Sequence, residues 1–131
     1  MAIEVFFDGR GKVNASIKGF TVKTDQNVKA GGEGSAPEPF TLFLASIATC
    51  AGVYVQSFCI QRDIPSNEIT LTMDYEMDLV TKMIALIRID IHVPGGFPEK
   101  YEGAVINAAA LCAVKRHLSD KIKSEITVKR K

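Results

Sequence analysis

The residues in this sequence best suited to chemistry are its cysteines, and two of them, Cys50 and Cys112, stand 62 positions apart. Cys50 lies in the middle of a long uncharged segment, and Cys112 closes a second apolar pattern with helical spacing. Three cysteines without CxxC pairs fit neither a secreted disulfide scaffold nor a zinc site. We therefore expect redox chemistry from a thiol pair, with no metal.

Cys50 is the thiol whose role needs the most explanation. Cys59 lies nine positions further on, so at about 100° per residue the two point to opposite faces of one helix, and we interpret Cys59 as a small buried hydrophobe. Cys50 is either a core cysteine or a reactive thiol. A reactive thiol needs its pKa of about 8.5 lowered by a cation, a metal or a helix N-terminus. Because Cys50 is mid-helix, that group has to come from elsewhere in the chain.

Other catalytic classes fit the residues less well. A cysteine hydrolase needs a histidine base, but His92 falls on the polar face of a predicted strand and His117 lies five residues past Cys112. No ligand pair has the standard spacing of a zinc site. The loop KAGGEGSAPEP is not a phosphate-binding loop, because no Gly-Lys-Ser/Thr follows it.

Composition places the chain among small globular proteins. Its 131 residues predict one domain spanning 1–131, with 47% hydrophobic and 24% charged residues. The net charge of +1, and a basic stretch at 115–131 without interleaved aromatics, predict no nucleic-acid partner. The sequence shows no signal-peptide pattern, so we expect a cytoplasmic protein.

The hydrophobic patterns alternate between strand and helix periods, which predicts an α+β domain. A Gly/Pro-rich loop covers 29–39, and Pro39 suits a first helical position. We expect strands at 2–7, 13–17, 20–22, 68–78, 82–93 and 126–128, with helices at 40–62 and from 98 onward.

The predicted helix at 40–62 carries no charge between Glu38 and Arg62, and about 20 apolar residues suffice to span a bilayer. Polar residues such as Thr49 and Gln56 interrupt it, and the rest of the chain alternates like a soluble sheet. We therefore predict a helix buried on nearly all sides rather than a membrane span. A protein this small buries such a helix most readily inside a homodimer.

The segment APEPFTLFLASIATC, with Gly31, Gly32 and Gly34 before it, resembles the OsmC/Ohr family of osmotically induced and organic-hydroperoxide-resistance proteins. The later segment NAAALCAVKRHL resembles the family's second-cysteine region, and the likeness covers essentially the whole chain. The resemblance implies an OsmC-like fold, with antiparallel sheets around a long buried central helix. It also implies an intertwined homodimer with active sites at the subunit interface.

The resemblance further implies a thiol-dependent peroxidase that acts in oxidative-stress defence without a metal, haem or flavin. Cys50 would be the peroxidatic thiol and Cys112 the resolving thiol, with a dithiol reductant, often a lipoyl group, resetting the pair. Apolar neighbours of Cys50, such as Phe43 and Tyr54, would favour an organic hydroperoxide over hydrogen peroxide.

The family's active members pair an activating arginine with a glutamate. Arg10 in the turn DGRG resembles that arginine, and Glu38, which follows Pro37, resembles the glutamate. Glu38 lies twelve residues before Cys50, whereas the family's glutamate falls nine or ten before; those positions hold Thr41 and Phe40. The alternative function is therefore a non-catalytic small-molecule-binding or redox-sensing protein on the same fold.

Overall fold

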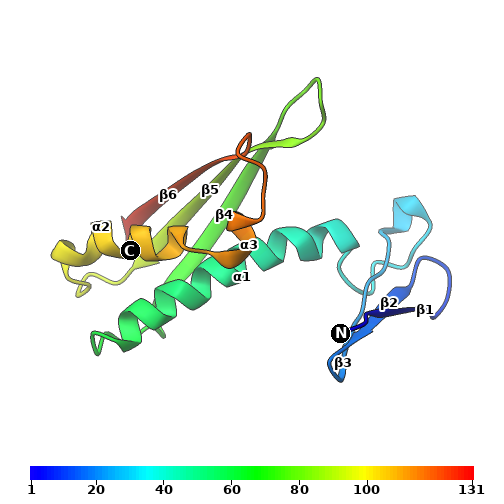
Figure 1. Cartoon of the computed structure of the whole chain (residues 1–131), viewed down its shortest axis with the longest axis horizontal. Coiled ribbons are helices and arrows are strands. Elements are labelled where there is room, and N and C mark those ends of the chain that lie inside the picture. The colour runs from blue at the N-terminus through cyan, green and yellow to red at the C-terminus, as the bar shows by residue number, and fades with distance from the viewer. The chain divides into compact units, whose positions relative to one another are not determined.

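The computed structural model describes residues 1–131, and the chain divides into two compact units, Met1–Ala45 and Ser46–Lys131. The helix α1 (Pro39–Ile60) contributes residues to both units. Figure 1 shows the helices and strands of each unit. The units are described separately below.

The N-terminal unit contains an antiparallel meander of β1 (Glu4–Phe7), β2 (Val13–Ile17) and β3 (Phe20–Val22). The turn between β1 and β2 is closed by a hydrogen bond from the Asp8 amide to the Lys12 carbonyl. Gly9 and Gly11 adopt positive φ angles there, a conformation that glycine adopts without steric cost. The meander predicted from the alternating residues is confirmed.

The loop between β3 and α1 is organised around the buried carboxylate of Asp25. The Asp25 side chain accepts hydrogen bonds from the amides of Gln26, Glu33 and Ser35 and from the Ser35 hydroxyl. The Ser35 hydroxyl, followed by the Ser35 amide, lowers the pKa of Asp25 to about 2. Within this loop lies a short 3-10 helix, η1 (Val28–Ala30), whose first turn is capped by the side chain of Asn27.

Helix α1 begins at Pro39, whose fixed φ suits the first helical position. It buries a single stripe, consisting of Ile47, Ala51, Val55, Phe58 and Cys59. The predicted enclosure of α1 within a homodimer stays a prediction, and in the single chain Val53 and Ile60 are exposed. The reason is that α1 packs within its own chain along one side only. By length and composition alone α1 could cross a membrane, a test that core helices of soluble proteins also pass.

The C-terminal unit is built on a three-stranded sheet with the order β4 (Thr70–Met77), β5 (Ile84–Val93), β6 (Lys123–Arg130). Strands β4 and β5 form the predicted antiparallel hairpin. Strand β6 runs parallel to β5 and is longer than predicted. The predicted antiparallel pairing is therefore confirmed for the other strands and wrong for β6. The helical crossover between β5 and β6 returns the chain to the starting end of the sheet, as a parallel neighbour requires.

Helices cover one face of this sheet. The crossover comprises the 3-10 helix η2 (Glu99–Tyr101), α2 (Glu102–Ala110) and α3 (Ala113–Arg116). Helix α2 contacts β6, while α1 and β4 share a hollow lined by Val55 and Leu71, and Figure 1 shows both helices running along the sheet. Alternate residues of β5 are fully buried and form the centre of the core: Ile87, Ile89, Ile91 and Val93.

Candidate functional site

The C-terminal unit brings Cys50 and Cys112 together. Cys50 projects from the middle of α1, and Cys112 occupies the cap position between α2 and α3. The Cys112 sulfur lies 3.7 Å from the carbonyl oxygen of Ile47, one turn before Cys50 on α1. The Cys112 side chain is also among the groups that lower the pKa of Cys50. Two thiols from elements that are distant in the sequence therefore lie in one site.

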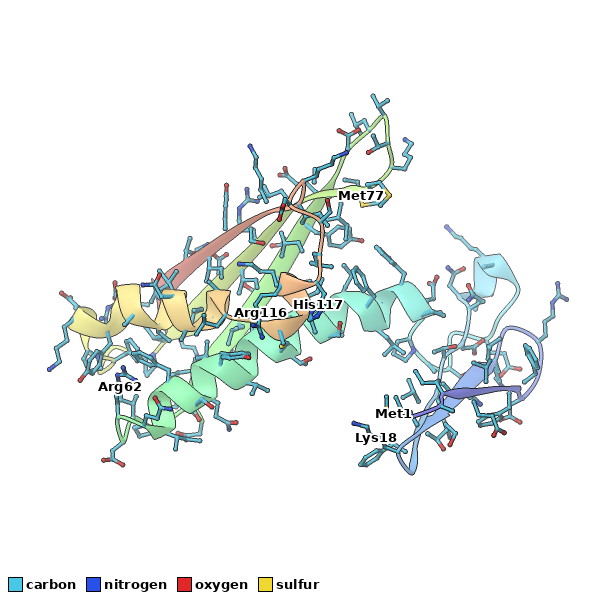
Figure 2. The ribbon with its side chains drawn as sticks, viewed as in Figure 1. Met1, Lys18, Arg62, Met77, Arg116 and His117 are labelled. Atoms are coloured by element: carbon cyan, nitrogen blue, oxygen red, sulfur yellow. The ribbon has the colours of Figure 1, made fainter.

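The surroundings of Cys50 favour its thiolate. The Val114 amide contributes most to lowering the pKa of Cys50, and the Cys112 side chain, the Ala113 amide and the positive charge of Arg116 act in the same direction. Burial opposes them, but Cys50 is only half-buried. Figure 2 shows Arg116 beside the middle of α1. The activating groups that a mid-helix thiol lacks in its own helix are thus supplied by 112–116.

The pKa of Cys112 is shifted in the opposite direction from that of Cys50. Its side chain is 1% exposed, and this burial is the main reason that its pKa is raised. A negative charge on Cys50 raises it further, while the Lys115 amide, 3.4 Å from the Cys112 sulfur, acts against the rise. Cys50 therefore ionises first, and the protonated Cys112 donates its S–H to the Ile47 carbonyl.

Cys59 is separate from this pair. It is fully buried on the core stripe of α1, and burial raises the pKa of its thiol. A protonated, inaccessible thiol behaves as a small apolar side chain. The interpretation of Cys59 as a buried hydrophobe is confirmed.

Arg10 and Glu38 both belong to the N-terminal unit, whereas the thiols belong to the other. The Arg10 guanidinium lies against Gly31, 3.3 Å from the position that a Cβ atom would take there. The Glu38 carboxylate accepts a hydrogen bond of 3.1 Å from the side-chain amide of Asn27. Arg10 and Glu38 therefore touch the same loop but are not ion-paired with each other.

The backbone amides of Ala113 and Val114 and the side chain of Arg116 are the site groups that the sequence did not single out. The sequence does show basic residues after Cys112. Nothing in it places them against α1, because that contact spans more than sixty residues. The two histidines have other partners, His92 the Thr72 hydroxyl and His117 the Ala113 carbonyl. No group of three or more His, Cys, Asp or Glu residues is placed to hold a metal ion.

A family model and several solved structures match this chain. A family model described as OsmC-like protein matches residues 32–127. A Psychrobacter arcticus protein, named for osmotic stress and a detoxification response, is 19% identical with a TM-score of 0.82, covering 98% of this chain and 96% of that one. An OsmC-like protein from Mycoplasma pneumoniae is 12% identical with a TM-score of 0.78, covering 98% and 95%.

The organic hydroperoxide resistance protein OhrB of Bacillus subtilis is 17% identical with a TM-score of 0.61, covering 98% of each chain. No curated protein sequence matches this chain. At these identities the solved structures establish the fold, and the family match covers most of the sequence, including both Cys50 and Cys112. The chain belongs to the OsmC-like protein family.

Proposed function

We propose that this protein is a thiol-dependent peroxidase that reduces organic hydroperoxides, with Cys50 as the attacking thiol and Cys112 as the resolving thiol. One observation carries the proposal: the two thiols meet in surroundings that shift their pKa values in opposite directions. An attacking thiol has to be a thiolate, and a resolving thiol has to stay available until the first has reacted. The names of the hydroperoxide-resistance structures agree with this chemistry.

The proposed reaction begins at Cys50. The Cys50 thiolate attacks one peroxide oxygen, the O–O bond breaks, and the other oxygen leaves as an alcohol after protonation. Cys50 is then a sulfenic acid. Cys112 attacks that sulfur, water leaves, and a Cys50–Cys112 disulfide forms. A dithiol reductant, such as a lipoyl group, restores both thiols by exchange and becomes a disulfide itself.

The proposal also assigns roles to three charged residues, a cellular compartment and an oligomeric state. Arg116 stabilises the Cys50 thiolate from within the same unit. Arg10 and Glu38 are the candidate activating pair by family resemblance, and their shared contact with the 25–37 loop makes that loop the element that would position both. We place the protein in the cytoplasm as a homodimer.

The test is a thiol count on fully reduced protein before and after one equivalent of cumene hydroperoxide, with peptide mapping under non-reducing conditions. Rapid loss of two thiols and a Cys50–Cys112 link are expected. Cys112→Ser should stop at a Cys50 sulfenic acid that a dimedone probe captures, while Cys59→Ser should behave like the parent protein. Three thiols surviving the peroxide would reject the peroxidase.

The second candidate function is a thiol redox sensor or binding protein. The hydrogen-bond partner of Glu38 favours it. The Glu38 carboxylate is bonded to Asn27 instead of to Arg10, so the arginine–glutamate pair of the active family members is not assembled within this unit. Turnover separates the two candidates. A sensor would form the disulfide once and slowly, whereas a peroxidase would consume hydroperoxide continuously when a dithiol is supplied.

A further inference from the structure

A hollow of about 550 Å³ lies between the end of α3 and the start of β6 in the C-terminal unit. Figure 1 shows the chain running directly from α3 to β6, so one short segment forms most of the wall. Hydrogen bonds of 3.0 Å fix this segment, from the Leu118 amide to the Lys115 carbonyl and from the Ile122 amide to the Ser119 carbonyl. Apart from Arg116, the proposed thiol cycle uses none of the residues that line the hollow.

Two adjacent cations line this hollow, Lys115 and Arg116 at the end of α3. No carboxylate lies within ion-pairing distance of either side chain. An ammonium and a guanidinium group carry only hydrogen-bond donors, so neither can satisfy the other. Two such cations in one concave place favour an anion as ligand.

Two serine hydroxyls line the same hollow. The Ser119 hydroxyl oxygen accepts a hydrogen bond of 3.2 Å from the Lys121 amide, which leaves its O–H available to donate. Ser124 pairs with the buried Ile87 across β6 and β5, so it begins the inward row that Ile126 continues. Lysine, arginine and serine side chains are the donors that proteins commonly direct at phosphate oxygens.

We propose that this hollow binds a phosphate-bearing anion through Lys115, Arg116, Ser119 and Ser124. A phosphate group carries about −1.5 to −2 charges at neutral pH and three acceptor oxygens, so it can engage several of these donors at once. A monocarboxylate has one charge and two oxygens, and it would leave part of the donor set unused. The volume of the hollow falls in the range of small-molecule sites, about 300 to 1,000 Å³.

Asp120 also lines the hollow and limits its affinity for an anion. The Asp120 carboxylate has the same sign of charge as the ligand, and like charges placed together oppose binding. Removing this charge should therefore strengthen binding. Loss of structure in a variant would only weaken binding, so Asp120→Asn gives a test whose sign is specific to the proposed site.

Arg116 connects the hollow to Cys50, and here the inference rests on the proposed function. The positive charge of Arg116 helps to lower the pKa of Cys50. An anion bound against Arg116 would offset that charge and reduce the thiolate fraction at neutral pH. A phosphate compound in the hollow would then slow the attack of Cys50 on a hydroperoxide without entering the thiol site.

Binding is tested without any peroxide, by calorimetric titration of the reduced protein with sodium pyrophosphate and with sodium acetate at matched ionic strength. Pyrophosphate is expected to bind more tightly than acetate. Lys115→Met should weaken pyrophosphate binding by about twofold to fivefold, the range for an exposed ion pair, and Asp120→Asn should strengthen it.

Lys100→Met is the matched control for this titration, because Lys100 belongs to η2 and does not line the hollow. It removes the same charge and should leave pyrophosphate binding unchanged. Equal pyrophosphate affinity in the parent and Lys115→Met proteins, an equal loss in Lys100→Met, or equal affinity for pyrophosphate and acetate would overturn the proposal.

Alkylation by iodoacetamide, with peptide mapping of Cys50, tests the link to the thiol without turnover. Saturating pyrophosphate should slow alkylation of Cys50 in the parent protein and have a smaller effect in Arg116→Met. An unchanged alkylation rate with pyrophosphate bound would overturn the link.

Turnover separates this inference from the proposed function. Pyrophosphate binding that depends on Lys115, in a protein that consumes no hydroperoxide, would contradict the peroxidase and support the anion site. Continuous hydroperoxide turnover in a protein that binds no pyrophosphate would contradict the anion site and support the peroxidase.

Discussion

At the scale of single residues, the chain activates Cys50 with groups that come from the other thiol's segment. The Val114 and Ala113 amides and the Arg116 charge all follow Cys112 in the sequence. Cys112 therefore has two roles in the proposed cycle: it resolves the sulfenic acid, and its segment stabilises the thiolate that precedes it. Forming the disulfide would join Cys50 to the segment whose amides and positive charge lower its pKa.

Arg116→Met is expected to raise the pKa of Cys50, because the positive charge that favours the thiolate is removed. The thiolate fraction at neutral pH then falls, and the pH curve for alkylation of Cys50 by iodoacetamide moves to higher pH. The shift should be modest, since backbone amides contribute more than Arg116 does. Lys115→Met is the matched control. Superimposable alkylation curves for the parent and Arg116→Met proteins would show that Arg116 does not lower the pKa of Cys50.

At the scale of elements, the loop before α1 owes its shape to one carboxylate and one glycine. The Asp25 carboxylate accepts hydrogen bonds from both ends of the loop, from Gln26 and from Ser35. A Cβ atom at Gly32 would lie 2.1 Å from the Gln26 carbonyl oxygen and 2.6 Å from the Asp25 carboxylate, so this position has room only for glycine. A loop rich in glycine is in this case rigidly specified, and both Arg10 and Glu38 contact it.

Asp25 makes the N-terminal unit sensitive to acid. A carboxyl whose pKa is lowered on folding stabilises the protein above its ordinary value of 3.8, and that contribution is lost as the pH falls from about 4 toward about 2. Asp25→Asn should lower the melting temperature at pH 7 and flatten its decline below pH 4, as followed by circular dichroism. Asp74→Asn is the control, because Asp74 is exposed on β4. An unchanged acid profile in Asp25→Asn would contradict the role given to this carboxylate.

At the scale of the whole molecule, much apolar surface remains uncovered in the single chain. Val53 of α1 is 60% exposed, and large apolar side chains of the N-terminal meander are exposed as well: Ile3, Val5, Phe7 and Phe20. Exposed apolar area on this scale is typical of an association surface. It agrees with the homodimer that family membership suggests, in which the central helices of two subunits would meet.

We therefore expect a dimer in sedimentation equilibrium and a melting temperature that rises with protein concentration. Val53→Lys should shift the equilibrium toward monomer by at least about tenfold, because an unpaired buried charge costs more than 1.4 kcal/mol. Leu79→Lys is the matched control, at a hairpin tip where Leu79 is 84% exposed. A parent protein that sediments as a monomer at all concentrations would exclude the homodimer.

Features that depend only on neighbouring residues could be predicted from the amino-acid sequence. Alternation along 70–77 and 84–93 specifies a hairpin with Ile87, Ile89 and Ile91 inside, since successive strand residues face opposite sides. Pro39 marks the start of α1, and the spacing of Cys50 and Cys59 separates their faces. Each of these follows from local geometry that no distant contact alters.

Features that depend on contacts between distant segments could not be predicted in this way. The parallel pairing of β6 with β5, the single buried stripe of α1, and the placement of Val114 and Arg116 against Cys50 all require knowing how the crossover packs. A hydrophobic pattern states that a face is covered but not by which segment, because apolar burial has no direction. The two cysteines could therefore be picked out from the sequence, while the groups that make one of them acidic could not.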